Sequence, residues 1–427
     1  MVKLSENKRQ TQDKALEKIS APAKAYIPLI QHIGKACSPL VNTGDYVFLG
    51  QKIASAEAHV FSPIHASVSG RVAGVQEWPH PVIGRCGTIV IENDRQDRLS
   101  GNQGIRESGE VNGLTPEQIR NIIFEAGIVG MGGASFPTHI KLNPPKPVDT
   151  LIVNGAECEP YLTSDYRLMV EKTEEILKGI ELVVKCVGAK KVFIAIEDNK
   201  PDAIKAFEGQ RVKGSKGQVR VLKTVYPQGG EKQLIKNILK KEVPQGKLPF
   251  DIGVLVHNVG TLFAIYEAVY LGKPLYERVV TVAGSCLQNP KNLLARLGTP
   301  IRELINSCAP LKEKPAKIII GGPMMGIAQF SIDAPVIKST TGVLLLNKKE
   351  ARMTEEEFCI RCGACIRECP AGLMPAMINL ASQKEMWDKA KAYGALDCIE
   401  CGLCGFVCPS NILLVQSIKR AKLEVLR

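Results

Sequence analysis

After a polar, lysine-rich opening, the first part of the chain shows short apolar and β-branched runs separated by glycine turns. These runs predict strands at residues 27–30, 46–49, 52–55, 67–75 and 88–92. We therefore expect an extended arm over residues 1–25 and a small β-sandwich over residues 26–95. The charged, glycine-containing segment 96–113 is expected to be a linker.

From residue 114 the pattern changes to apolar strands that alternate with helices. The triplet Thr115-Pro116-Glu117 is a helix start signal, and Ile119, Ile122 and Ile123 continue the apolar pattern after it. Buried strands are predicted from Leu151 and over residues 191–196, 218–225 and 252–256. Alternation of this kind predicts a Rossmann-like parallel sheet over residues 114–275.

Polar turns follow three of these strands. They are Asn154-Gly-Ala-Glu157-Cys-Glu159, Tyr226-Pro-Gln-Gly229-Gly-Glu231 and His257-Asn258-Val-Gly-Thr261. A glycine-rich run precedes them, Gly127-Ile-Val-Gly-Met-Gly-Gly-Ala-Ser-Phe-Pro-Thr-His-Ile-Lys141, and its bare backbone lets a flat ring or a phosphate approach closely. Its spacing departs from the dinucleotide-binding pattern, and such a loop alone is often an ordinary loop. Because ligands bind at the carboxyl edge of open α/β sheets, we expect these four loops to form one site.

Composition and charge narrow the function classes. The 427 residues are enough for about three domains, and 45% of them are hydrophobic and 23% charged, as in ordinary globular proteins. We find no run of about 18 uncharged apolar residues and no signal-peptide pattern, so we expect a cytoplasmic location. The formal net charge is +12, but the lysines are dispersed, and we expect no nucleic-acid partner. Docking on an acidic membrane face or an acidic protein is the alternative to plain surface charge.

Eight cysteines form two copies of the pattern C-x2-C-x2-C-x3-C-P, which is the spacing of bacterial ferredoxins with two [4Fe-4S] clusters. The first copy contains Cys359, Cys362, Cys365, Cys369 and Pro370. The second copy contains Cys398, Cys401, Cys404, Cys408 and Pro409. In two-cluster ferredoxins the last cysteine of each copy ligates the other cluster. One predicted ligand set is therefore Cys359, Cys362, Cys365 and Cys408. The other is Cys398, Cys401, Cys404 and Cys369.

Zinc sites and disulfides are the alternatives for these cysteines. Zinc sites usually take four ligands as two separated pairs, and disulfides need an oxidising compartment. The duplicated motif therefore favours iron-sulfur clusters. The other six cysteines are scattered and are expected to be small apolar side chains, and the six histidines show no ligand spacing.

The order of these motifs resembles the flavin-binding subunit of respiratory complex I. Nearly the whole chain from Tyr26 to the cysteines is similar to the C subunits of Rnf complexes, which are membrane ion-translocating oxidoreductases. The resemblance implies a multidomain α/β and β protein: a lipoyl-like β-sandwich, a Rossmann-like FMN domain, a soluble-ligand-binding β-grasp (SLBB) domain over residues 276–345 and a two-cluster ferredoxin domain over 346–427. Residues 66–69, the expected tip of the lipoyl-like domain, contain no lysine for a swinging group, so we expect a scaffold. Within the last domain, a helix over residues 378–393 is expected to join the two cysteine motifs.

The resemblance also implies roles for individual residues. The residues expected to line FMN are Gly130, Gly132, Gly133 and Ala134, with Lys141 near its phosphate or the nucleotide. The residues expected around the isoalloxazine are Asn154, Glu157, Glu159, Tyr226, Gly229 and Glu231, and the catalytic candidates among them are Glu157 and Glu159. Asn258 and Thr261 would close the phosphate end. Phe136 and Phe250 would stack on the nicotinamide nucleotide.

Plain structural roles are the alternative at these positions. Asn154 and Asn258 can cap turns, the two glutamates can be solvated, and Phe250 can be a core residue. The chain also departs from the complex I pattern at four positions, where Met131 replaces an arginine, Ser135 a glycine, Ala156 an aspartate and Gly230 a glutamate. The expected site therefore carries fewer charges than that pattern.

The function implied is that of a peripheral subunit on the cytoplasmic side of the cell membrane. It would pass electrons between NAD(H), FMN and two [4Fe-4S] clusters within an NAD:ferredoxin oxidoreductase that moves ions. Its partners would be other Rnf subunits, especially the ferredoxin-like B subunit and the membrane D and G subunits. One alternative is a soluble flavin and iron-sulfur reductase for a corrinoid or amino-acid reductase system. Another is a non-enzymatic electron-wire subunit without flavin.

Overall fold

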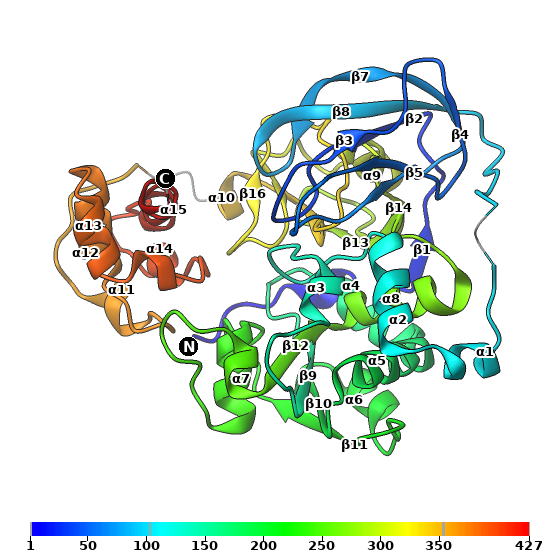
Figure 1. The fold of residues 1–427 in the computed structure, drawn as a ribbon. Coiled ribbons are helices and arrows are strands. Elements are labelled where there is room, and N and C mark those ends of the chain that lie inside the picture. Colours follow the sequence, from blue (N-terminus) through cyan, green and yellow to red (C-terminus); the bar gives the residue numbers. More distant parts are fainter. Residues whose placement is uncertain (1, 102–103, 352–354, 427) are drawn as a thin grey trace.

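The computed structural model describes residues 2–101, 104–351 and 355–426. Met1, residues 102 and 103 of the expected linker, residues 352–354 of the expected ferredoxin domain and Arg427 lie outside the described residues. A body that contains the sheets stands beside a helical unit formed by the last part of the chain, drawn in orange and red in Figure 1. Among the described residues, no helix combines the length and the apolar character needed to cross a bilayer.

The β-sandwich consists of two small sheets. One has the order β2-β8-β7-β4 and contains β2 (Lys24–Pro28), β4 (Tyr46–Val47), β7 (Gly70–His80) and β8 (Gly84–Asn93). The other has the order β3-β5-β6 and contains β3 (Ser38–Pro39), β5 (Lys52–Ser55) and β6 (Ile64–His65). Residues 66–69 are buried, and the Ser67 hydroxyl donates a hydrogen bond to the Leu297 carbonyl. The prediction of a tip at these residues is therefore wrong, because the stretch packs against the neighbouring domain.

The central sheet has the order β11-β10-β9-β12, and all neighbouring strands are parallel. Its strands are β9 (Thr150–Gly155), β10 (Lys191–Glu197), β11 (Lys216–Leu222) and β12 (Val254–Asn258). The four strands predicted from the apolar runs are confirmed, although β11 begins two residues and ends three residues earlier than expected, and β12 begins and ends two residues later. Parallel sheets are covered on both faces, which is why the runs in β9, β10 and β12 are largely apolar, whereas β11 at the edge of the sheet is mostly exposed.

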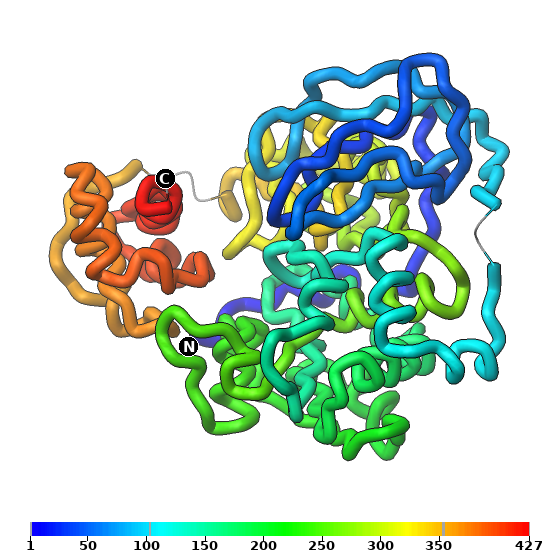
Figure 2. Tube along the Cα trace, viewed as in Figure 1, coloured from blue at the N-terminus to red at the C-terminus, as the bar shows by residue number. Residues whose placement is uncertain are grey.

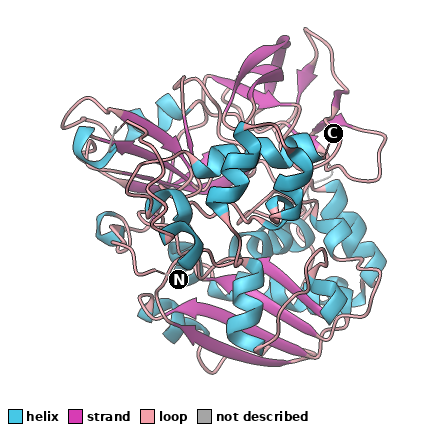
Figure 3. Cartoon of the chain, turned by 90° about the vertical axis from the view of Figure 1, so that its left-hand side faces the viewer, coloured by secondary structure: helices cyan, strands magenta, loops and turns pink. Residues whose placement is uncertain are grey.

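Helices cover both faces of this sheet (Figures 1 and 3). Leu151 and Val153 share a hydrophobic core with α2 (Pro116–Glu125), α5 (Thr173–Val187) and α8 (Val259–Leu271). Ile152 points to the other face and packs with α7 (Glu231–Leu239). The predicted helix start is confirmed, because Thr115 and Gln118 form a capping box at α2. The shorter helices are α1 (Ser108–Gly113), α3 (Thr138–Lys141), α4 (Ser164–Glu171) and α6 (Pro201–Phe207).

A six-stranded mixed sheet follows, with the order β1-β14-β13-β17-β15-β16. Its strands are β1 (Leu16–Lys18), β13 (Glu277–Ala283), β14 (Lys291–Arg296), β15 (Lys317–Ile320), β16 (Ile327–Ala328) and β17 (Gly342–Leu346), and α9 (Ile301–Ser307) accompanies them. Strand β1 comes from the N-terminal arm and pairs in parallel with β14. The arm is extended as predicted, but it is built into the molecule.

The last unit is helical. It contains α11 (Ala364–Arg367), α12 (Pro375–Gln383), α13 (Trp387–Ala392), α14 (Leu403–Phe406) and α15 (Leu414–Val425), and α10 (Lys348–Ala351) precedes it. Its small core joins α12, α13 and α15 through Ile378, Ala390 and Ile418. The prediction of one helix over residues 378–393 is wrong: Glu385 has a φ of 53°, and this left-handed residue separates α12 from α13.

Candidate functional site

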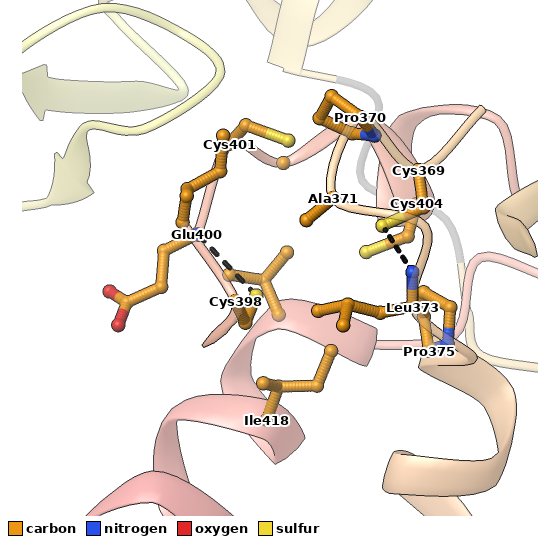
Figure 4. Close-up of a pocket in the computed structure, with 13 residues that line it drawn as sticks. Cys369, Pro370, Ala371, Leu373, Pro375, Cys398, Glu400, Cys401, Cys404 and Ile418 are labelled. Atoms are coloured by element: carbon orange, nitrogen blue, oxygen red, sulfur yellow. Dashed lines mark hydrogen bonds between the residues drawn. The ribbon is translucent and has the colours of Figure 1, made fainter. Parts of the chain in front are cut away.

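The eight motif cysteines surround two cavities. We call the first set the inner cage: Cys369, Cys398, Cys401 and Cys404. We call the second set the outer cage: Cys359, Cys362, Cys365 and Cys408. Each cage takes three cysteines from one motif and the last cysteine from the other. Figure 4 shows the inner cage, with the cysteines arranged around a space that Leu373 and Ile418 also line.

This arrangement suits a cubane cluster better than a zinc ion or disulfides. All 14 cysteines are free of disulfides. Within the described part of the chain, no three or more Cys, His, Asp or Glu side chains come close enough to hold a single metal ion. The sulfurs surround a space instead of converging on one point. The four-cysteine sets are those expected of a two-cluster ferredoxin, and the individual ligand assignments stay predictions.

Backbone amides and cationic side chains also approach the cages. In the inner cage, the Leu373 amide donates to the Cys369 sulfur at 3.3 Å, and the Glu400 amide donates to the Cys398 sulfur at 3.4 Å. The Lys422 ammonium donates to the Cys398 carbonyl at 3.0 Å. At the outer cage, the Arg367 guanidinium donates to the Cys362 carbonyl at 2.9 Å. Hydrogen bonds and charges of this kind tune cluster potentials.

The inner cage lies against the loops of the central sheet. The buried Tyr226 hydroxyl donates to the Cys401 carbonyl at 2.7 Å. The loop between β15 and β16, which we call the β-grasp loop, contains Met324. Gly402 packs so tightly on this loop that an added Cβ would lie 2.4 Å from the Met324 carbonyl oxygen. Next to Cys359 of the outer cage, by contrast, Phe358 is 97% exposed.

The second part of the site is the carboxyl edge of the central sheet. Asn154 is the penultimate residue of β9 and is in register with Asn258, which ends β12. Both asparagines therefore lie at the carboxyl edge of the parallel sheet, the edge at which open α/β folds bind ligands. The Asn258 side chain accepts from the Gly260 amide at 2.8 Å and donates to Asp165 at 2.6 Å. Asn154 donates to the Gly229 carbonyl at 2.9 Å. Both asparagines therefore fasten loops, as the structural alternative predicts.

The glycine loop lies over this edge. Thr261 accepts a hydrogen bond from the Met131 amide at 2.9 Å and so ties the loop to α8. Gly132 is required for packing, because a Cβ there would lie 2.8 Å from the Asn258 side chain. Gly133 is different: it is exposed, and nothing lies within 4 Å of an added Cβ. With the exposed Ala134, it presents open backbone that fits the approach of a flat cofactor such as FMN.

Both predicted catalytic glutamates are engaged in hydrogen bonds. The Glu157 carboxylate accepts from the Asp165 amide at 2.7 Å and the Tyr166 amide at 3.1 Å, and so caps α4. The Glu159 carboxylate accepts from the Met324 and Met325 amides at 3.1 and 2.8 Å. Burial raises the pKa of Glu159 to about 7, while these amides oppose the shift. A catalytic role for either glutamate stays a prediction.

Two of the remaining predicted residues meet at this edge. Lys141 and Glu231 form an ion pair at 2.8 Å and are both partly exposed. The buried His257 lies near Lys141, and burial together with that charge lowers its pKa. Phe136 belongs to the glycine loop, where its carbonyl accepts from the Gly130 amide.

Phe250 lies elsewhere. It belongs to the short 3-10 helix η2 (Pro249–Ile252), which precedes the start of β12 and packs against the core at the opposite edge of the sheet. Five strand residues span about 16 Å, so this placement favours the core role over stacking on a nucleotide at the glycine loop.

Sequence reasoning missed a partly buried aspartate and a buried lysine near this site. Asp165 faces Asn258, and burial and the neighbouring Glu157 charge raise its pKa. Lys8 reaches from the N-terminal arm to the turn that carries Glu157 and Glu159. The run Thr163-Ser164-Asp165 could have been recognised as a helix start. No signal marks Lys8, which resembles any other lysine of a polar arm.

Four family models match the chain. They are the RnfC barrel sandwich hybrid domain at residues 2–96, the Nuo51 FMN-binding domain at 123–267, the SLBB domain at 279–328 and a 4Fe-4S dicluster domain at 352–409. The expected fold class is confirmed by these matches. They also confirm FMN and two [4Fe-4S] clusters as the cofactors, and the open backbone at Gly133 and the two four-cysteine cages suit these groups.

Three curated proteins are similar over nearly the full chain. The C subunit of the proton-translocating ferredoxin:NAD(+) oxidoreductase complex of Clostridium ljungdahlii is 46% identical over 98% of this chain and 92% of its own length. The Na(+)-translocating counterpart of Acetobacterium woodii is 45% identical over 95% and 91%. The C subunit of the ion-translocating oxidoreductase complex of Rhodobacter capsulatus is 42% identical over 97% and 80%.

Among solved structures, the crystal structure of an NAD+-reducing [NiFe]-hydrogenase in the H2-reduced state aligns with a TM-score of 0.51 and 17% identity. The alignment covers 73% of this chain and 63% of that chain, and it supports the fold alone. The curated relatives carry the assignment, because their identity is above 40% over almost all of the sequence. The chain belongs to the family of C subunits of ion-translocating (Rnf) oxidoreductase complexes.

Proposed function

We propose that the protein is the electron-input subunit of an ion-translocating ferredoxin:NAD oxidoreductase. Electrons would pass between NAD(H) and FMN at the carboxyl edge of the central sheet, then through the inner cage and the outer cage to partner subunits. The observation that carries this order is the direct contact between the sheet-edge loop and the inner cage, where Tyr226 donates to the Cys401 carbonyl. When bound, FMN exchanges two electrons with NADH as a hydride and exchanges them singly with the clusters.

The chain's own residues would perform three tasks in this function. The open backbone at Gly133 and Ala134 would receive the cofactor ring, and Lys141 would lie toward a phosphate. Asn154 and Asn258 hold the loops that border the ring. Tyr226, Cys401 and Leu403 are buried together and would exclude water between the flavin site and the inner cage.

The same proposal includes partners and location. We place the protein on the cytoplasmic side of the membrane, with the ferredoxin-like B subunit and the membrane D and G subunits as partners. The exposure of Phe358 and Ile360 at the outer cage supports an exit for electrons on that side.

Anaerobic purification with quantified FMN, iron and sulfide tests the proposal, followed by an NADH titration monitored by absorbance and EPR. We expect FMN and two clusters, and we expect NADH to bleach both kinds of centre. A protein with iron and sulfide but no FMN, whose clusters do not respond to NADH, would be an electron wire. Co-purification with membrane subunits separates the Rnf function from a soluble reductase.

A further inference from the structure

We infer that residues 2–8, which we call the N-terminal clasp, hold the sheet-edge loops against the inner cage, with Lys8 as a positioning residue. The inference rests on the proposed function and adds to it a segment that carries neither a predicted cofactor contact nor a cluster ligand. In Figures 1 and 2 the N-terminal end lies between the central domain and the helical unit. The clasp is therefore placed where the two redox sites meet.

Val2 and Leu4 pack at the contact between the Tyr226 loop and the inner cage, which we call the junction. The Val2 amide donates to the Tyr226 carbonyl at 3.0 Å, and the Tyr226 amide donates back to the Val2 carbonyl at 2.8 Å. Both clasp side chains pack into the cluster formed by Tyr226, Cys401 and Leu403. The clasp thus pairs with the sheet-edge loop whose Tyr226 hydroxyl reaches the cage.

Glu6 and Lys8 hold the second loop, the turn from Glu157 to Leu162. The Glu6 carbonyl accepts from the Tyr161 amide at 2.8 Å. The buried Lys8 ammonium donates to the carbonyls of Glu157 at 2.8 Å, Glu159 at 2.9 Å and Leu162. An ammonium has three N–H donors, so this side chain is fully used in fastening one turn.

The same turn reaches the cage from its other side. Its Glu159 carboxylate binds the Met324 and Met325 amides, and the Met324 carbonyl packs on Gly402 beside Cys401. The turn is therefore fixed between Lys8 and the β-grasp loop. If the hydrogen bonds of Lys8 are lost, the turn can move and the distance between the flavin site and the inner cage increases. The rate of electron transfer falls steeply with that distance.

Deuterium exchange of the full-length protein tests the positioning role without using activity. In Lys8→Met, we expect the amides of Tyr161, Asp165 and Tyr166 to exchange about tenfold faster, because three buried carbonyls lose their donor. Lys14→Met is the matched control, since the Lys14 ammonium of the same arm donates to the Pro290 carbonyl, away from the junction. Lys8→Arg keeps the charge and should restore part of the protection.

Anaerobic stopped-flow mixing with NADH, combined with freeze-quench EPR, provides the second readout. We expect Lys8→Met to slow cluster reduction by about tenfold and to slow FMN reduction clearly less. Should Lys8→Met lose its cofactors, Leu4→Ala removes only side-chain packing at the same contact. It should likewise slow cluster reduction more than FMN reduction.

Two results would overturn the inference. One is unchanged exchange in Lys8→Met relative to Lys14→Met. The other is an equal slowing of FMN and cluster reduction, which would indicate general destabilisation. If NADH fails to reduce FMN in the unaltered protein, the proposed function is lost, but the exchange experiment still decides whether the clasp holds the turn.

Discussion

The two cysteine cages share one sequence motif and differ in their surroundings. Cys401 and Cys404 of the inner cage are buried, with 8% and 7% of their surface exposed, whereas Cys359 and Cys362 of the outer cage are exposed. Tyr226 and the Met324 loop reach the inner cage from two other domains. The motif forms the same local cage twice. The contacts with the other domains make one cage face the sheet-edge loops and leave the other cage exposed to solvent.

This difference teaches how one duplicated motif can give a directional path. A cluster covered by protein is within reach of the flavin site, and an exposed cluster is within reach of a partner. Solvent exposure, hydrogen bonds and net charge also set cluster potentials. We therefore expect equivalent substitutions in the two cages to have unequal effects.

Removing one ligand from each cage gives the largest effect. Cys401→Ser and Cys359→Ser should each lose about half of the bound iron, since each destroys one cage. Cys401→Ser should slow the reduction of the remaining cluster by NADH at least about 100-fold, because the path from the flavin site is cut. Cys359→Ser should leave the inner cluster reducible by NADH. Iron analysis and stopped-flow EPR measure this, and the opposite pattern would reverse the proposed order of the cages.

Removing one cation beside each cage gives a smaller effect. Lys422 is 24% exposed and pairs with Glu400 beside the Cys398 carbonyl, while the backbone carbonyl of Cys362 binds Arg367. Lys422→Met should lower the inner-cluster potential by about 50 mV, because it leaves a carboxylate without its nearest cation. Arg367→Met should shift the outer cluster by less than half of this, because water screens exposed charges. Redox titrations followed by EPR measure both potentials, and equal shifts would contradict the contrast in burial.

Tyr226→Phe removes only the hydroxyl that joins the sheet-edge loop to the inner cage. One hydrogen bond contributes about 1 kcal/mol, so we expect cluster reduction by NADH to slow about fivefold. The outer-cluster potential serves as the internal control and should not move. A Tyr226→Phe protein with unaltered kinetics would show that packing alone maintains the junction.

Glu159 should give the smallest effect, seen in the pH dependence of stability. Burial raises the pKa of Glu159 from 4.5 to about 7, so the folded protein holds a proton that the unfolded chain has released between these values. Raising the pH through this interval therefore lowers the free energy of unfolding. The difference in thermal midpoint between the unaltered protein and Glu159→Gln should fall by roughly 3 °C from pH 5 to pH 8. If the thermal midpoints of the two proteins change equally with pH, Glu159 is ionised in the folded protein over the whole range from pH 5 to pH 8.

Much of the site could be predicted because it depends on local sequence. Cysteines at fixed spacing within short loops leave few ways to surround a cluster, and the apolar runs before Asn154 and Asn258 predict two strands of one parallel sheet. Phe250 could not be placed in this way. It lies four residues before the start of β12, and only the strand direction shows that it is at the far edge.

The clasp and the helix break mark the limit of such reasoning. Lys8 and Val2 bind residues more than 140 positions away in the sequence. The local sequence of the polar arm does not predict these contacts. The break at Glu385 follows from the packing of α12 and α13 on α15, which the apolar pattern of residues 378–393 does not specify.

The sequence by itself determined the two cages, the parallel sheet and the family. Cysteine spacing and apolar periodicity act over a few residues, so the local structure that they specify does not depend on distant parts of the chain. Only the tertiary structure decided which cage is covered, which edge is shared and what the N-terminal residues hold. Those outcomes depend on contacts between distant segments, where burial and hydrogen bonding select one arrangement from many that the local pattern allows.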